Sequence, residues 1–272
     1  MDTLMDMFLQ LDSWLSGLMF FFLMFLGWGL GLTVLRFVDR GHREDSSRIE
    51  DAALALFGLL LAFCFSGAAN RYETRKSLLL TEAIAIGDFA TTASMFEPNI
   101  SDPLRKELVF YVQQRLKTSD MRIDDPAMPL ESERTLHSQE RLRLLVQQAI
   151  REKDTPTLHT PLMNGYNGLT QAHDNRYYGN RNQVPGSIVM VLVIFGVFTT
   201  FNMGRAGGCP AGKRFATWLR IMIYAAMVAM VFTVTIDLEQ PRRGFIHASK
   251  APLQTLLNSL SQSAPVAALP TP

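Results

Sequence analysis

The chain has 272 residues, of which 48% are hydrophobic and 19% are charged, with a formal net charge of +1. A near-neutral chain without a basic, aromatic-rich run argues against a nucleic-acid partner. Its two cysteines show no spacing pattern, which argues against a disulfide framework or a metal site. The apolar residues fall into four blocks, and a bilayer core takes roughly 20 apolar residues in a row. We therefore predict an integral membrane protein without a cofactor.

The first block, residues 14–38, is long enough to cross a bilayer and carries one charge, Arg36, near its far end. A secretory signal peptide instead has a basic start and an apolar core of about 7–15 residues. Residues 1–13 contain aspartates but no Lys or Arg. The block is therefore predicted to be a retained span, and residues 1–69 a first membrane hairpin.

The second block, residues 52–69, runs into charged sequence without a Gly/Pro break. Its helical spacing predicts one helix that continues to about Phe96. At 100° per residue, Arg71, Arg75 and Glu82 fall within about 40° of one line. This stripe is either a cationic lining at a pore mouth, with Glu82 orienting the arginines, or a set of headgroup-level arginines with Glu82 in a structural ion pair.

Residues 70–186 are predicted to form a helical extramembrane domain. One helix is expected to start at Asp102, with Pro103 in its first position. Its apolar stripe consists of Leu104, Leu108, Tyr111, Val112 and Leu116. Two further helices are expected over residues 131–153 and 161–178, the first of them highly charged.

The last two blocks, residues 187–203 and 215–236, predict a second membrane hairpin over residues 187–236. Residues 237–272 would add a short amphipathic helix and a disordered tail. No segment requires a strand. The predicted fold is therefore all-α, with four spans and a helical extramembrane domain between spans two and three.

The distribution of Lys and Arg predicts the orientation in the cell membrane, taken here as a bacterial inner membrane. Cytoplasmic short loops are enriched in these residues. The short loops 39–51 and 204–214 and their edges are rich in Lys and Arg, whereas the N-terminal segment has none. This count places both short loops in the cytoplasm and the helical domain outside.

Two motifs resemble a known family. The stretch "LFGLLLAFCFSGAANRYETRKSLLLTEAIAIGDF" is similar to the corresponding stretch of bestrophins, and more closely to that of bacterial bestrophin-like membrane proteins. Their Arg-Tyr-x-x-Arg-Arg…Glu-Ala-x-Ala-Ile-Gly signature is matched by Arg71, Tyr72, Arg75, Lys76, Glu82, Ala83, Ala85, Ile86 and Gly87. After the last span, Asp237, Pro241 and Gly244 resemble the family's Leu-Asp-x-Pro-x-x-Gly segment, with one residue more between the Asp and the Pro.

The resemblance implies a pentameric anion channel whose second span lines the pore with an apolar constriction. Leu59 and Phe63 then match the first two constriction positions, with a lipid-facing or core role as the alternative. The third position is Gly67, which implies a shorter or wider neck. The acidic calcium clasp of animal bestrophins is missing, so calcium gating is not implied. The resemblance also places the termini and the helical domain in the cytosol, against the Lys and Arg count.

Other chemistry finds little support in the sequence. The five histidines lack the paired spacing of a helical zinc site, and His173 is expected in a surface or core-capping role. No nucleophile–base pair stands out, so we predict no enzyme. Two functions remain: a homo-oligomeric channel for inorganic anions in the lipid bilayer, or a non-conducting membrane sensor or scaffold whose helical domain binds a partner.

Overall fold

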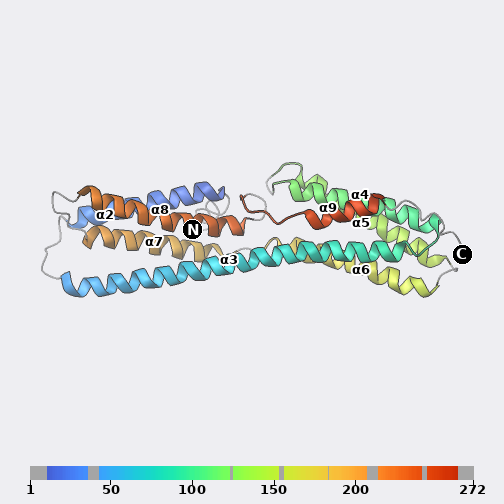
Figure 1. Ribbon diagram of the computed structural model, residues 1–272, viewed down its shortest axis with the longest axis horizontal. Coiled ribbons are helices and arrows are strands. Elements are labelled where there is room, and N and C mark those ends of the chain that lie inside the picture. Colours follow the sequence, from blue (N-terminus) through green and yellow to red (C-terminus); the bar gives the residue numbers. More distant parts are fainter. Residues whose placement is uncertain are drawn as a thin grey trace, which may run out of the picture. The chain divides into compact units, whose positions relative to one another are not determined.

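The computed structural model describes residues 11–35, 43–122, 125–152, 156–182, 184–206, 214–240 and 244–262. Within these ranges it contains eight helices and no strand (Figure 1), which confirms the predicted all-α class. The helices are α2 (Ser13–Leu35), α3 (Arg43–Ala93), α4 (Pro98–Asp120), α5 (Met128–Arg151), α6 (Pro156–Gly179), α7 (Gly186–Ala206), α8 (Arg214–Glu239) and α9 (Ala251–Gln262).

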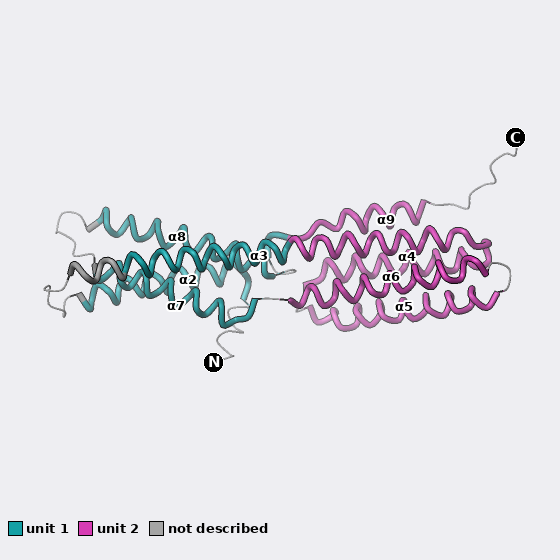
Figure 2. The backbone as a smooth tube through the Cα atoms, turned by 90° about the horizontal axis from the view of Figure 1, so that it is seen from below, with its two compact units in different colours: residues 1–72, 183–246 teal, residues 73–182, 247–272 magenta. Residues whose placement is uncertain are grey.

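Among the described residues, four helical stretches are long and apolar enough to cross a membrane. They are Ser13–Val34, Glu50–Ala93, Gly186–Arg205 and Phe215–Glu239, and each contains most or all of one predicted block. The chain divides into two compact units (Figure 2). Unit 1 comprises residues 1–72 and 183–246, and unit 2 comprises residues 73–182 and 247–272. The predicted disordered tail, residues 263–272, lies outside the described residues.

Unit 1 is built on close contacts of α2 with α7 and α8. A Cβ added at Gly31 would lie 2.0 Å from the carbonyl oxygen of Phe201, and one at Gly204 would lie 2.2 Å from that of Trp28. Small residues let helix backbones approach this closely, which is a common basis of packing between membrane helices. Only one face of α3, with Phe57 and Leu61, joins the buried core of this unit.

Unit 2 is a bundle of the second half of α3 with α4, α5, α6 and α9. Apolar residues at helical spacing form its core, as the stripes in the sequence predict. On α4 they include Leu104, Leu108 and Val112, and on α9 they include Leu253 and Leu260.

The start of α4 differs from the prediction. The helix begins at Pro98, and Pro103 lies inside it. Proline suits a first helical position because its φ angle is preset and it has no N–H that would need a partner. Pro98 offers the same advantage as Pro103, four residues before the predicted start at Asp102.

Candidate functional site

The apolar part of α3 has one exposed face in the part of the chain that the structure describes. Leu59 and Phe63, one helical turn apart, are 54% and 66% exposed. At 100° per residue, the exposed residues Ser66 and Asn70 lie within about 40° of the same line. Among the four candidate spans of the described chain, this stretch is the least buried. We call Leu59, Phe63, Ser66 and Asn70 the open face of α3.

Gly67, the third predicted constriction position, lies beside the side chain of Arg71. A Cβ at Gly67 would be 3.3 Å from Arg71 Nη2. Arg71 donates from Nε to Glu239 Oε1 at 2.8 Å, and its Nη2 lies 2.7 Å from the same oxygen. The other oxygen of Glu239 accepts the backbone N–H of Val184 at 3.2 Å. The absence of a side chain at position 67 therefore leaves room for an arginine that joins α3 to the end of α8.

The constriction candidates and the arginine stripe lie on different faces of α3. Arg71, Arg75 and Glu82 are roughly 120–160° around the helix from Leu59. Arg75 and Glu82 are both buried. The structure thus places Leu59 and Phe63 on an exposed face, and the buried members of the stripe inside unit 2.

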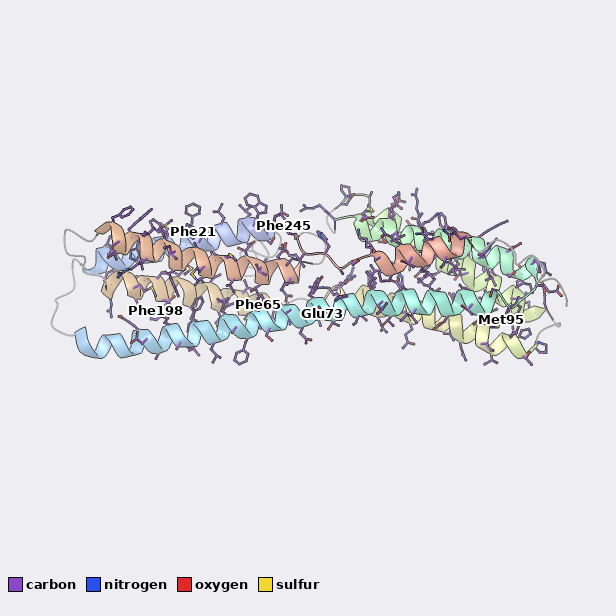
Figure 3. All side chains as sticks on the ribbon, viewed as in Figure 1. Phe21, Phe65, Glu73, Met95, Phe198 and Phe245 are labelled. Carbon is purple, nitrogen blue, oxygen red and sulfur yellow. The ribbon has the colours of Figure 1, made fainter. Side chains whose placement is uncertain are left out.

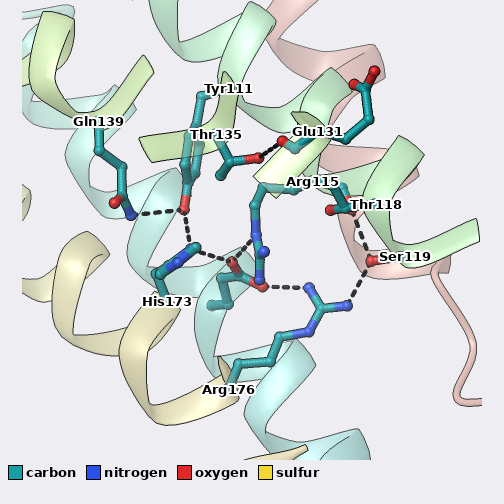
Figure 4. A network of polar contacts seen from close by, with 10 residues as sticks. Tyr111, Arg115, Thr118, Ser119, Glu131, Thr135, Gln139, His173 and Arg176 are labelled. Atoms are coloured by element: carbon teal, nitrogen blue, oxygen red, sulfur yellow. Dashed lines mark hydrogen bonds and ion pairs between the residues drawn. The ribbon is translucent and has the colours of Figure 1, made fainter. Parts of the chain in front are cut away.

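Glu82 is the centre of a buried ionic network between three helices, and Figure 4 labels its partners Arg115 and Arg176. Its carboxylate accepts hydrogen bonds from Arg115 Nε on α4 at 2.6 Å and from Arg176 Nη1 on α6. Arg176 Nη2 also donates to Ser119 Oγ at 2.7 Å. A buried charge is tolerated when opposite charges and hydrogen bonds surround it. Glu82 therefore holds α4 and α6 against α3.

A histidine and a tyrosine extend this network (Figure 4). His173 Nδ1 lies 3.2 Å from Tyr111 Oη, and Gln139 Nε2 donates to the same Oη at 3.5 Å. Burial, together with the nearby Arg115 charge, lowers the pKa of His173 to about 4. Burial also raises the pKa of Tyr111. Both side chains are therefore neutral at pH 7 and serve as hydrogen-bonding partners within the bundle.

Asp237 organises the second motif at the end of α8. Its buried carboxylate accepts the Ser13 hydroxyl at 2.5 Å and the backbone N–H groups of Phe245 and Ile246, each at 2.9 Å. A Cβ at Gly244 would lie 2.3 Å from Asp237 Oδ1, so a larger residue there would force the carboxylate or the loop to shift. Pro241 lies outside the described residues. We call these contacts the Asp237 clasp.

Arg115, His173 and Arg176 were not identified as members of one site from the sequence. Each continues the buried stripe of its helix: Arg115 follows Leu108 and Tyr111 on α4, while His173 and Arg176 follow Leu169 on α6. In the sequence, the signal that could have identified them is that polar residues occupy positions where the buried apolar stripe of a helix continues. The sequence does not show that their side chains meet at Glu82.

Comparisons with known proteins place the chain in a family. A family model described as the Bestrophin-like domain matches residues 50–253. Two crystal structures of a bacterial bestrophin homologue from Klebsiella pneumoniae, a tryptophan-to-alanine and a tyrosine-to-alanine variant, have TM-scores of 0.63 and 0.62 at 14% sequence identity. The matches cover 91% and 88% of this chain and 95% and 96% of the homologue.

A crystal structure of a further membrane protein has a TM-score of 0.55 at 16% identity, over 89% of this chain and 95% of the other. At these identities the structures show a shared fold. A search of curated proteins found no match. The family model covers most of the chain, including the arginine–glutamate stretch and the part of the Asp237 clasp formed by Asp237, Phe245 and Ile246, but not Ser13. The chain belongs to the Bestrophin-like family.

Proposed function

We propose that the protein is a homo-oligomeric, anion-permeable channel in which the open face of α3 lines the pore. The open face itself carries this proposal. It is a row of exposed side chains on a candidate span, whereas the opposite face of the same helix is packed into unit 1. Within the described residues of one copy this face is exposed, so a pore along it requires several copies around a common axis. The bestrophin resemblance points to five.

Leu59 and Phe63 would form the apolar neck of this pore. Hydrophobic constrictions gate channels by dewetting, because a narrow apolar passage does not hold a continuous column of water. Ser66 and Asn70 lie on the same line of the helix and would provide a polar passage beyond the neck. Selectivity for anions rests on the resemblance to bestrophins.

Arg71 and Glu82 fit a structural ion-pair role better than a pore-mouth lining, and Arg75 is buried rather than exposed at a pore mouth. The Arg71 guanidinium contacts Glu239, and the Glu82 carboxylate contacts Arg115 and Arg176. We assign to these residues the role of holding α3 in place, so that the open face keeps its orientation. Residues 70–186 would then form an extramembrane helical domain that holds this helix.

Chloride efflux from proteoliposomes tests the proposal. Phe63→Ala should raise the flux severalfold, because it removes the largest side chain of the neck. Phe65→Ala is the matched control: it removes the same ring from a partly exposed position on α3 that lines a groove against α8. Figure 3 labels Phe65. This control should leave the flux unchanged.

Folded protein that leaves the vesicles tight to chloride, in the parent and in Phe63→Ala alike, would contradict the channel. It would favour the non-conducting sensor or scaffold. Native mass measured in nanodiscs provides a second criterion, since a monomer would also contradict a pore built from several copies.

A further inference from the structure

Two exposed aromatic residues are attached to the Asp237 clasp. Phe245 is 78% exposed, although its own backbone N–H is bonded to the Asp237 carboxylate. Trp14 is 53% exposed and follows Ser13, whose hydroxyl is bonded to the same carboxylate. The clasp thus holds two large rings in defined positions at one end of unit 1, facing outward. Figure 3 labels Phe245 at this end of α8.

The other end of α8 has a second aromatic pair. Phe215 and Trp218 lie in its first two turns, and their ring centroids are 6.4 Å apart in a stacked arrangement. Both rings are exposed. Unit 1 therefore has exposed aromatic residues at both ends of its last helix.

The distance between the two pairs matches the thickness of a bilayer. Asp237 follows Phe215 by 22 positions and Trp218 by 19. At about 1.5 Å per residue, the two levels are about 28–33 Å apart along the helix. The hydrocarbon core of a bilayer is about 30 Å thick. Apart from Arg220, the exposed side chains of α8 between the levels are apolar, among them Ile223, Met227 and Met230.

We propose that Trp14 and Phe245 lie at one hydrocarbon–headgroup boundary of the membrane, and Phe215 and Trp218 at the other. Tryptophan is enriched at such levels because its ring contacts the apolar chains while its N–H stays close to the headgroup layer, and phenylalanine inserts its apolar ring at the same boundary. The Asp237 clasp then acts as a positioning device, because it fixes the first pair to the end of α8. Arg220, one turn from the second boundary, can extend its charged end to the headgroups.

A second copy of the chain fits these rings less well than lipid. An interface between copies would not require two aromatic levels separated by one membrane thickness. The proposal rests on the membrane location of unit 1 and does not depend on conduction. A failed flux assay and a failed depth measurement are therefore distinguishable.

Single-tryptophan proteins in vesicles containing brominated lipids test the proposal. Changing Trp28 and Trp218 to Phe leaves Trp14 as the reporter. In a second protein, all three tryptophans are changed to Phe and Phe245→Trp is added, so that the single tryptophan reports on the segment after α8. A matched protein with Phe22→Trp as its only tryptophan reports from an exposed site on α2, eight residues beyond Trp14 and thus about 12 Å deeper in the span.

Reporters at positions 14 and 245 should be quenched more strongly by bromines near the headgroups than by bromines near the bilayer centre. The reporter at position 22 should show the reverse order. Quenching of the first two reporters by aqueous iodide but by neither lipid would overturn the proposal in favour of water. Protection from iodide and from both lipids would overturn it in favour of a protein contact.

Discussion

The guanidinium of Arg71 and the carboxylate of Glu239 join the middle of α3 to the last residue of α8, with Arg71 Nη2 and Glu239 Oε1 2.7 Å apart. Glu239 is almost completely buried, and Arg71 is partly exposed. Because the same carboxylate also accepts the Val184 N–H, one acidic residue connects three segments of unit 1. The pair therefore holds α3 against the end of α8.

Reversing the charge at position 71 should destabilise the protein. Arg71→Glu places a second carboxylate beside Glu239, and breaking a buried pair costs about 3–5 kcal/mol, less here because Arg71 is partly exposed. Adding Glu239→Arg should restore part of the lost melting temperature, since the pair is rebuilt in reverse while Val184 loses its acceptor. Thermal melts in detergent measure both effects. Equal melting temperatures for the single and double variants would show that the pair contributes little.

Substituting Glu82 should destabilise the protein more than substituting an exposed acidic residue. Glu82→Gln leaves Arg115 and Arg176 buried without their counter-charge, at a cost of about 3–5 kcal/mol. Glu73→Gln is the matched control, because Glu73 forms an exposed pair with Lys76 at 3.5 Å. Exposed pairs contribute little to stability. The first variant should lower the melting temperature strongly and the second hardly at all, and similar melting temperatures would contradict the role given to the network.

Low pH should weaken unit 2 through His173. The folded protein holds this imidazole neutral with a pKa of about 4, whereas an unfolded chain binds its proton below about pH 6.5. Between these values the unfolded state binds more protons, so stability is complete above pH 6.5 and falls as the pH drops toward 4. At about 1.4 kcal/mol per pKa unit the loss is about 3 kcal/mol.

Melting temperatures at pH 7 and pH 5 check this expectation. His173→Gln keeps a side chain that can bond to Tyr111 but does not titrate in this range. It should be less stable than the parent at pH 7 and lose less stability on acidification. The same pH dependence in both proteins would show that another group controls the acid sensitivity.

Much of the fold follows directly from the sequence. Each of the four apolar blocks falls largely or wholly on a helix because length and composition alone determine whether a segment can span a bilayer. The stripes of α4 and α6 are also visible, since helical periodicity is a local property. The helix start at Asp102 was wrong because two prolines compete for it, and sequence alone does not rank them.

The site was less predictable because it depends on pairings between distant residues. The helical wheel places Arg71 and Glu82 on one line, yet their partners are 168 and 94 positions away in Glu239 and Arg176. Only packing in three dimensions decides which charges meet. Gly67 illustrates the same limit, since only the structure shows that the Arg71 side chain lies beside it.

Gly244→Ala should disrupt the Asp237 clasp. The added methyl group would lie 2.3 Å from Asp237 Oδ1. The segment after α8 must therefore move, and the hydrogen bonds from the Phe245 and Ile246 N–H groups to Asp237 must lengthen. Gly168→Ala is the control, because a Cβ there meets nothing within 4 Å on a helix. Alanine is favoured over glycine in a helix by about 1 kcal/mol. Thermal melts should show a loss for the first variant and no loss for the second. Two equal melting temperatures would contradict the clasp.

The orientation in the membrane can be measured with cysteine labelling in intact cells. In a background with Cys64→Ser and Cys209→Ser, we expect Ser46→Cys to resist a membrane-impermeant thiol reagent and Ser132→Cys to react. The reason is the concentration of Lys and Arg in and around the short loops, which favours the cytoplasm. Permeabilised cells provide the control, since both cysteines should then react. The opposite pattern in intact cells, with Ser46→Cys labelled and Ser132→Cys protected, would show that the arrangement implied by the bestrophin resemblance holds. The helical domain of unit 2 would then face the cytosol.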